Sequence, residues 1–151
     1  MRKIFAIAAL FVPLTAAIAP VDDPGQIIDL PAIVIDTITH DDVMQAIIFV
    51  ESSGNDNAHR ISEDAVGCLQ IRRTMVRDVN RILRRNGSDK RYGYKDRWNR
   101  QLSIEMFDIY CKHYNLITPE EKARCWNGGP KGLQKLNTKR YWEKVKRRLN
   151  G

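Results

Sequence analysis

Residues 43–71 read VMQAIIFVESSGNDNAHRISEDAVGCLQI. The apolar run that opens this stretch ends at Glu51, and residues 52–54 (SSG) follow it directly. In a helix, Glu51 lies four residues after Ile47 and three after Ile48, so its carboxyl group shares their apolar face. A negative charge is costly there, because it is withdrawn from water and lies near the negative end of the helix dipole. The sequence therefore predicts a carboxyl group that tends to hold its proton.

Two interpretations of Glu51 are open from this stretch alone. A carboxyl group that stays protonated near neutral pH is suited to act as a general acid. A buried glutamate that is satisfied by a neighbouring polar group would have the same local sequence. Choosing between them requires the rest of the sequence.

Three blocks of sequence occur in a defined order: residues 51–71, residues 123–132 (ARCWNGGPKG) and residues 138–145 (TKRYWEKV). They resemble the lytic transglycosylase and lysozyme-like superfamily of peptidoglycan-cleaving enzymes. That family has Glu-Ser, then Ser-x-x-Gly-Ala-x-Gly-Leu-Met-Gln-Ile, then Ala-Tyr-Asn-x-Gly and a late Tyr. The last two blocks are closer to invertebrate-type lysozymes, with Asn-Gly-Gly-Pro and Thr-x-x-Tyr-Trp-x-x-Val. The resemblance covers about residues 43–145, and it implies an α+β lysozyme-like fold.

The resemblance also implies roles for single residues. Glu51 matches the catalytic glutamate of the family, and the positions expected to bind substrate are Ser52, Gln70, Asn127, Gly128 and Tyr141. The amide of Gln70 can both donate to and accept from an N-acetyl group or a sugar hydroxyl. The glycines after Asn127 leave room for a polysaccharide to approach the backbone. For Ser52 a bond to the backbone, and for Tyr141 packing in the core, are the open alternatives.

The chain departs from the family pattern at two positions. Asp64 stands where transglycosylases have a glycine, close to where invertebrate-type lysozymes place a catalytic aspartate. A second carboxylate is what glycoside hydrolysis usually requires, so Asp64 is a candidate, although an aspartate that bonds its own loop would look the same. Trp126 replaces the family's tyrosine and removes a hydroxyl there.

The expected reaction is cleavage of the β-1,4 bond between N-acetylmuramic acid and N-acetylglucosamine in peptidoglycan. A lytic transglycosylase needs one glutamate, by resemblance, because the sugar's own 6-hydroxyl closes the 1,6-anhydro ring. A hydrolytic lysozyme that uses Glu51 with Asp64 is the alternative. A third hypothesis is a wall-binding or assembly protein without catalysis.

Length and the first residues predict one exported domain. The chain has 151 residues, enough for a single core. Residues 1–19 have a basic start, an apolar stretch and small residues near the end, as a secretory signal peptide does. Residues 20–38 form an expected extended lead-in and residues 39–151 the lysozyme-like catalytic domain. We expect a secreted or periplasmic protein with no stable membrane insertion after signal cleavage; an uncleaved anchor is the alternative.

The formal net charge is +7, which suits an anionic partner. Peptidoglycan glycan strands are the expected partner, in wall turnover or with secretion, conjugation or phage machinery. The basic run at residues 139–148 would also suit nucleic acid, but its aromatic and apolar residues recur at helical spacing. An amphipathic helix with a solvated basic face is the preferred interpretation, and no nucleic-acid partner is expected.

Helix signals dominate the remaining sequence and predict a mainly α domain with at most a small β hairpin near residues 55–70. Capping patterns mark two helix starts, at Thr39 with Asp42 and at residues 118–121 (TPEE). Three further helices are expected to begin near hydroxyl residues that could cap them: Thr74, Ser103 and Thr138.

Cysteine and histidine spacing predicts no metal site and no other cofactor. Three cysteines are an odd number for an exported chain. Cys111 and Cys125 fall on consecutive expected helices, and the sequence leaves open whether they pair.

Overall fold

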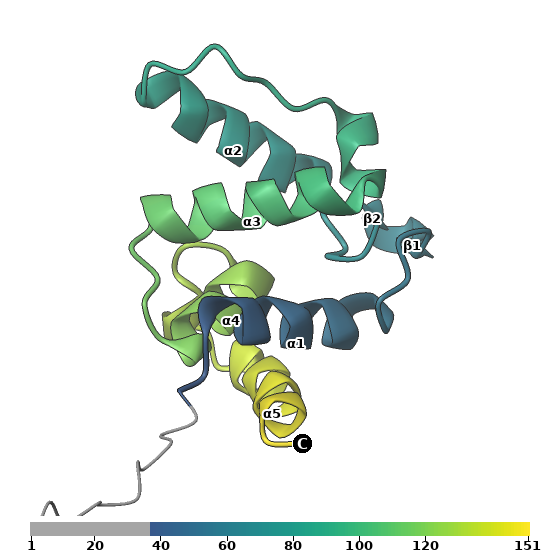
Figure 1. The fold of residues 1–151 in the computed structure, drawn as a ribbon, viewed down its shortest axis with the longest axis vertical. Coiled ribbons are helices and arrows are strands. Elements are labelled where there is room, and N and C mark those ends of the chain that lie inside the picture. The colour runs from purple at the N-terminus through teal and green to yellow at the C-terminus, as the bar shows by residue number, and fades with distance from the viewer. Residues whose placement is uncertain (1–36) are drawn as a thin grey trace, which may run out of the picture. The chain divides into compact units, whose positions relative to one another are not determined.

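Five α-helices and one short hairpin make up the part of the chain that this computed structural model describes, residues 37–151 (Figure 1). The helices are α1 (His40–Ser52), α2 (Arg73–Arg85), α3 (Arg100–His113), α4 (Pro119–Gly128) and α5 (Asn137–Leu149). The expected signal peptide and nearly all of the expected lead-in, up to residue 36, lie outside the described residues. The prediction of a mainly α domain is confirmed.

The predicted hairpin is also present, and it is small. Strand β1 (His59–Arg60) pairs in antiparallel fashion with β2 (Ala65–Val66), and a single bridge joins Val66 to Ile71. Between the strands the chain makes a 3₁₀ turn over Ile61–Glu63. The hairpin connects the end of α1 to the start of α2, so it carries the chain away from Glu51 and back towards Gln70.

Both predicted capping motifs are present. Thr39 and Asp42 form a reciprocal capping box at the start of α1, and Thr118 and Glu121 form another at α4. At the other end of α1 the left-handed residue is Ser53, whose N–H donates to Phe49, and Gly54 follows it with φ of 80°. The sequence therefore located the start of α1 to within about two residues.

Helices α2 and α5 begin within one residue of Thr74 and Thr138, as expected, and α3 begins three residues before Ser103, but none of the three hydroxyls caps its helix. Helix α2 begins at Arg73, before Thr74, and α3 begins at Arg100 after Asn99, whose side chain accepts from the N–H of Leu102. Ser103 and Thr138 lie inside α3 and α5, buried. Their hydroxyls are used in tertiary contacts instead, since Ser103 donates to the carbonyl of Arg97 and Thr138 to that of Gly132.

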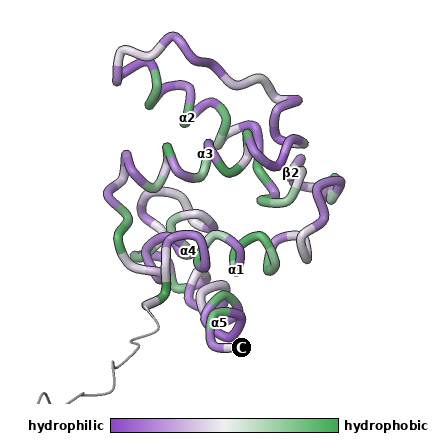
Figure 2. Tube along the Cα trace, viewed as in Figure 1, coloured by the Kyte–Doolittle hydropathy of each residue, from purple (hydrophilic) through white to green (hydrophobic). Residues whose placement is uncertain are grey.

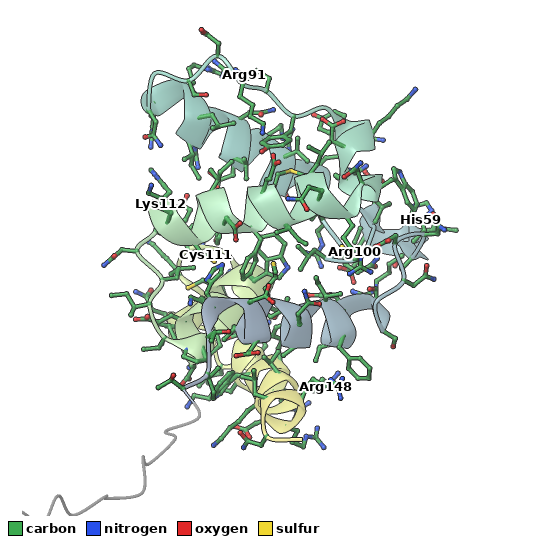
Figure 3. The ribbon with its side chains drawn as sticks, in the orientation of Figure 1. His59, Arg91, Arg100, Cys111, Lys112 and Arg148 are labelled. Atoms are coloured by element: carbon green, nitrogen blue, oxygen red, sulfur yellow. The ribbon has the colours of Figure 1, made fainter. Side chains whose placement is uncertain are left out.

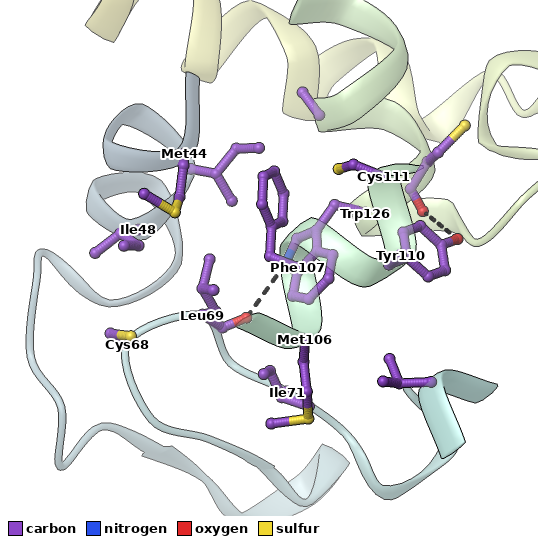
Figure 4. Close-up of a cluster of buried hydrophobic side chains, with 14 of the residues drawn as sticks. Met44, Ile48, Cys68, Leu69, Ile71, Met106, Phe107, Tyr110, Cys111 and Trp126 are labelled. Carbon is purple, nitrogen blue, oxygen red and sulfur yellow. Dashed lines mark hydrogen bonds between the residues drawn. The ribbon is translucent and has the colours of Figure 1, made fainter. Parts of the chain in front are cut away.

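The core forms around α3, which lies between α2 and α1 in Figure 1. Phe107 and Tyr110 of α3 meet Trp126 of α4 edge-on, with ring centroids 5.0 and 5.8 Å apart. Figure 4 shows this aromatic group beside Met44 and Ile48 of α1. Apolar and polar residues alternate along α2 and α5, as the changing colours in Figure 2 show, so each helix buries one face and exposes the other.

Two buried arginines hold loops to this core. Arg97 donates through its guanidinium to the carbonyls of Tyr94, Asp64 and Ile71, and so fixes the hairpin. Arg124 of α4 binds Glu120 and Thr138 together with the carbonyl of Leu133. Both side chains have enough partners to offset the cost of removing their charge from water.

Arg100 connects α3 to the loop that follows α1. Its guanidinium reaches the carbonyl of Gly54 and the carboxylate of Asp56 (Figure 3). The three cysteines, all within the described part, are buried and free, so Cys111 and Cys125 are not paired. Burial raises the pKa of the Cys111 thiol to about 12. Within residues 37–151 no helix is both long and apolar enough to cross a membrane.

Candidate active site

Glu51 lies in the last turn of α1 and lines a cleft of about 710 Å³. The other walls of this cleft come from the hairpin, the loop before α2, the outer face of α2, and the end of α4 with the turn that follows it. Of the substrate positions expected from the sequence, Gln70, Asn127 and Gly128 line the same cleft. Residues from blocks that are far apart in the sequence are therefore brought together around one carboxyl group.

The carboxyl group of Glu51 is held by Tyr141 of α5. The Tyr141 hydroxyl lies 2.8 Å from Oε1 of Glu51 and donates to it. Burial raises the pKa of Glu51 above its usual range, while the hydrogen bond from Tyr141 and the charges of Arg60 and Arg72 only partly oppose this. The carboxyl group is thus partly withdrawn from water, fixed in orientation and favoured in its protonated form.

Burial and the nearby Glu51 together raise the pKa of Tyr141 far above its ordinary value. The phenol therefore stays protonated and acts as a donor at any physiological pH. Its ring also packs against the core, which is the alternative role considered for Tyr141 in the sequence. The two roles are compatible, because the ring and the hydroxyl face different partners.

Gln70 is buried and has a left-handed backbone with φ of 47°. Its side-chain nitrogen donates to the carbonyls of Ala58 and Gly67, at 3.1 and 3.0 Å. These bonds close the loop that carries the hairpin and orient the amide. With the nitrogen occupied by the backbone, the amide oxygen is the atom that Gln70 can offer to a bound molecule.

The Asn-Gly-Gly sequence at the C-terminal end of α4 forms one rim of the cleft. Asn127 is exposed, and Gly129 has φ of 81°, a conformation that L side chains rarely adopt. Gly128 packs so closely on Thr138 that a Cβ at this position would lie 2.6 Å from its methyl carbon. Trp126 also lines the cleft, and its indole N–H donates to the carbonyl of Leu69; this bond is drawn as a dashed line in Figure 4.

Ser52 does not line the cleft. Its hydroxyl lies 3.2 Å from the carbonyl of Ile48 and 2.8 Å from that of Cys68, and it is the donor in both contacts. The alternative interpretation of Ser52, a bond to the backbone, therefore describes its position here. By tying the end of α1 to the loop before Gln70, it fixes Glu51 and Gln70 relative to each other.

Asp64 also lies outside the lining of the cleft. It is a left-handed residue next to β2, and its carboxylate pairs with Arg73 at 2.6 Å and with Arg97 at 3.5 Å. Burial acts to raise the pKa of Asp64, but the charges of Arg97 and Arg73 outweigh it and hold the pKa below its usual range. Here Asp64 is an ionised partner of two arginines.

Several residues that line the cleft have no counterpart in the sequence analysis. They are mostly basic: Arg60, Arg72, Arg77, Arg81 and Lys135, with Asp78 beside them. Arg77 and Arg81 are one helical turn apart on α2, and this spacing could have been noticed in the sequence. Asp78 accepts a hydrogen bond from the Tyr114 hydroxyl and pairs with Arg81.

No protein-family model matches this chain, and no curated protein has a significant match to it. Within residues 37–151 no three acidic, histidine or cysteine side chains are grouped as a metal ion would require. The arrangement itself offers one carboxyl group whose pKa is raised by burial, one phenol donor and one oriented amide around an open cleft. Such groups can deliver a proton to an oxygen atom of a bound polymer.

Proposed function

We propose that this protein cleaves the β-1,4 glycosidic bond between N-acetylmuramic acid and N-acetylglucosamine in peptidoglycan, as a lytic transglycosylase. One observation carries the proposal: Glu51, with its raised pKa and its bond from Tyr141, faces a cleft also lined by Gln70 and Asn127. These four residues are among the six positions that match the family's site residues in the sequence; the other two are Ser52 and Gly128.

In the proposed reaction Glu51 first gives its proton to the glycosidic oxygen as the bond to the anomeric carbon breaks. The Glu51 carboxylate then accepts the proton of the muramic acid 6-hydroxyl. The 6-oxygen attacks the anomeric carbon and closes a 1,6-anhydro ring, which leaves Glu51 protonated again. Tyr141 would hold the carboxyl group in place through both steps, and Gln70 would position the sugar.

The arrangement of acids supports transglycosylation over hydrolysis. Hydrolysis usually needs a second carboxylate facing the sugar, to hold water or to attack the anomeric carbon. Asp64 is paired with two arginines and does not line the cleft, and Asp78, the other acid in the lining, is paired with Arg81. An intramolecular hydroxyl needs no such partner.

The test is to incubate the purified protein with peptidoglycan and determine the masses of the released fragments. Anhydro ends, each one water lighter than a reducing end, are expected. Reducing ends would overturn transglycosylation in favour of the hydrolytic alternative. Release of no fragments, with tight binding that is unchanged in Glu51→Gln, would instead favour a non-catalytic wall-binding protein.

Glu51→Gln should lower the rate by about 10²–10⁴-fold, because an amide cannot supply the proton. Glu143→Gln on the exposed face of α5 makes the same chemical change away from the cleft and should keep full activity. A cell-envelope setting follows from the substrate. Turnover of the wall, or its opening for secretion, conjugation or phage machinery, are the roles that this activity would serve.

A further inference from the structure

The cleft carries more positive charge than an uncharged sugar chain would need. Its basic lining residues are Arg60, Arg72, Arg77, Arg81 and Lys135, against the acids Glu51 and Asp78. If Glu51 keeps its proton, Asp78 is the single negative charge among these lining residues. Such an excess of one sign in a cleft concentrates ligands of the opposite sign.

Part of this charge is neutralised by neighbours. Glu63 pairs with both Arg60 and Arg72, and Asp78 pairs with Arg81. Arg77 and Lys135 have no ion pair with any residue of the described part, 37–151, but Lys135 donates to the carbonyl of Gly128, whereas Arg77 has no such partner there. Its guanidinium therefore remains available to a ligand in the cleft.

The placement of Arg77 follows from the pattern of α2. This helix buries the face formed by Val76, Val79, Ile82 and Leu83. Arg77 and Arg81 lie one turn apart on another face, together with Thr74, and all three line the cleft. The guanidinium of Arg77 is a planar donor, the geometry that carboxylates accept best, and Arg81, already paired with Asp78, lies beside it.

We propose that this α2 wall binds the carboxylates of peptides attached to the glycan, so that the protein prefers peptide-bearing strands to bare glycan. The inference rests on the proposed function, since it takes the occupant of the cleft to be peptidoglycan. The sugar rings would lie along Glu51, Gln70 and Asn127, and an acidic peptide branch would reach Arg77. A nucleic acid is the competing polyanion, and the test below includes it.

The experiment measures binding, so that its outcome does not depend on cleavage. The Glu51→Gln protein is titrated with soluble glycan strands that carry their peptides and with the same strands after an amidase has removed the peptides, which leaves only the lactyl carboxylate on each muramic acid. Peptide-bearing strands should bind about tenfold more tightly. Raising the salt concentration should reduce this difference, because charges at an open cleft are screened.

Arg77→Gln, introduced in the Glu51→Gln protein, should remove most of the tenfold preference while leaving the affinity for bare glycan unchanged. Lys146→Gln is the matched control, because it removes one positive charge from the exposed part of α5, outside the cleft lining. It should keep the preference. Both residues are exposed, so neither substitution threatens the fold.

Equal affinity for the two kinds of strand would overturn the inference, as would an equal loss in Arg77→Gln and Lys146→Gln. Binding of a single-stranded DNA oligonucleotide as tightly as peptide-bearing glycan would overturn it in favour of a phosphate-binding cleft. A preference for peptide-bearing strands with no cleavage by the unaltered protein would leave the inference standing and remove the proposed activity, so the two failures are distinguishable.

Discussion

The hydroxyl of Tyr141 lies 2.8 Å from a carboxyl oxygen of Glu51, although the two residues are 90 positions apart in the chain. Glu51 lies at the end of α1 and Tyr141 in the second turn of α5, and these helices pack directly on each other. The last helix thus orients a group carried by the first. Burial alone would leave the carboxyl group without a partner, and the phenol supplies one while it only partly opposes the rise in pKa that burial causes.

Tyr141→Phe should therefore shift the pH dependence of cleavage. The bond from Tyr141 lowers the pKa of Glu51 and partly offsets the effect of burial, so its loss should raise that pKa further. A general acid works while it is protonated, and the fall in rate at high pH should move to a higher pH. The maximal rate should drop about tenfold, because the carboxyl group loses its orientation. A pH–rate profile with peptidoglycan measures both effects.

Tyr94→Phe is the control for this change, since Tyr94 is exposed and does not line the cleft. Its profile should match that of the unaltered protein. If Tyr141→Phe also left the profile unchanged, the hydroxyl would have no part in setting the proton affinity of Glu51.

The same carboxyl group should make stability depend on pH. Burial raises the pKa of Glu51 in the folded state above its unfolded value. Below the unfolded pKa both states are protonated and Glu51 carries no penalty. As the pH rises through the folded pKa, the folded protein loses stability, because a charge must be kept in a partly buried place.

Glu51→Gln removes that charge and keeps an oxygen that can accept from Tyr141. The variant should therefore be more stable than the unaltered protein, by a margin that grows with rising pH. Urea unfolding at several pH values checks this, with the exposed Glu143→Gln as a variant whose margin should stay constant. A margin that shrinks as the pH rises would mean that Glu51 is ionised and well solvated in the folded protein.

Asp64→Asn separates the two proposed chemistries. Asp64 pairs with Arg73 and Arg97 and lies outside the cleft lining. The Asp64→Asn protein should therefore cleave peptidoglycan at a rate within about threefold of that of the unaltered protein, whereas Glu51→Gln should lose about 10²–10⁴-fold. Fragment release from peptidoglycan measures both. A loss in Asp64→Asn as large as that in Glu51→Gln, with unchanged folding, would place the second carboxylate in the reaction and favour hydrolysis.

Features that depend on neighbours in sequence were predictable. The capping boxes at Thr39 and Thr118 need only residues three positions apart, and the hairpin follows from a polar stretch between two apolar ones. The apolar face of α1 also placed Glu51 correctly, partly buried at the end of its helix. Its partner Tyr141 was a candidate only through resemblance, since nothing local links the two residues.

Features that depend on tertiary contacts were not predictable. Ser103 and Thr138 have the side chains of helix caps, yet neither caps its helix, and the hydroxyl of each donates to a buried carbonyl instead. From the sequence Arg97 would be taken for an exposed loop residue, but it is buried, and three backbone carbonyls accept hydrogen bonds from its guanidinium. The basic wall of the cleft arises because α2 lies opposite the end of α4, an arrangement that the sequence pattern does not indicate.

Gly128→Ala should destabilise the protein through a contact with one methyl group. The added Cβ would lie 2.6 Å from the methyl carbon of Thr138, whose side chain is fully buried and held by hydrogen bonds through its hydroxyl. Overpacking of this kind costs about 1–3 kcal/mol in the free energy of unfolding, measurable by urea denaturation. Gly93→Ala is the control, because its Cβ would meet a side chain at 3.8 Å, an ordinary contact, and its stability should change by less than about 0.5 kcal/mol.

Thr138→Ser tests whether that methyl group is the cause. Serine keeps the hydroxyl that binds Arg124 and the carbonyl of Gly132, and it lacks the methyl group that the new Cβ would strike. In the double variant most of the cost of Gly128→Ala should therefore disappear, giving a coupling energy of about 1 kcal/mol or more between the two positions. Additive effects would show instead that the cost comes from another neighbour, such as the Lys135 side chain, whose Cδ the new Cβ would meet at 3.4 Å.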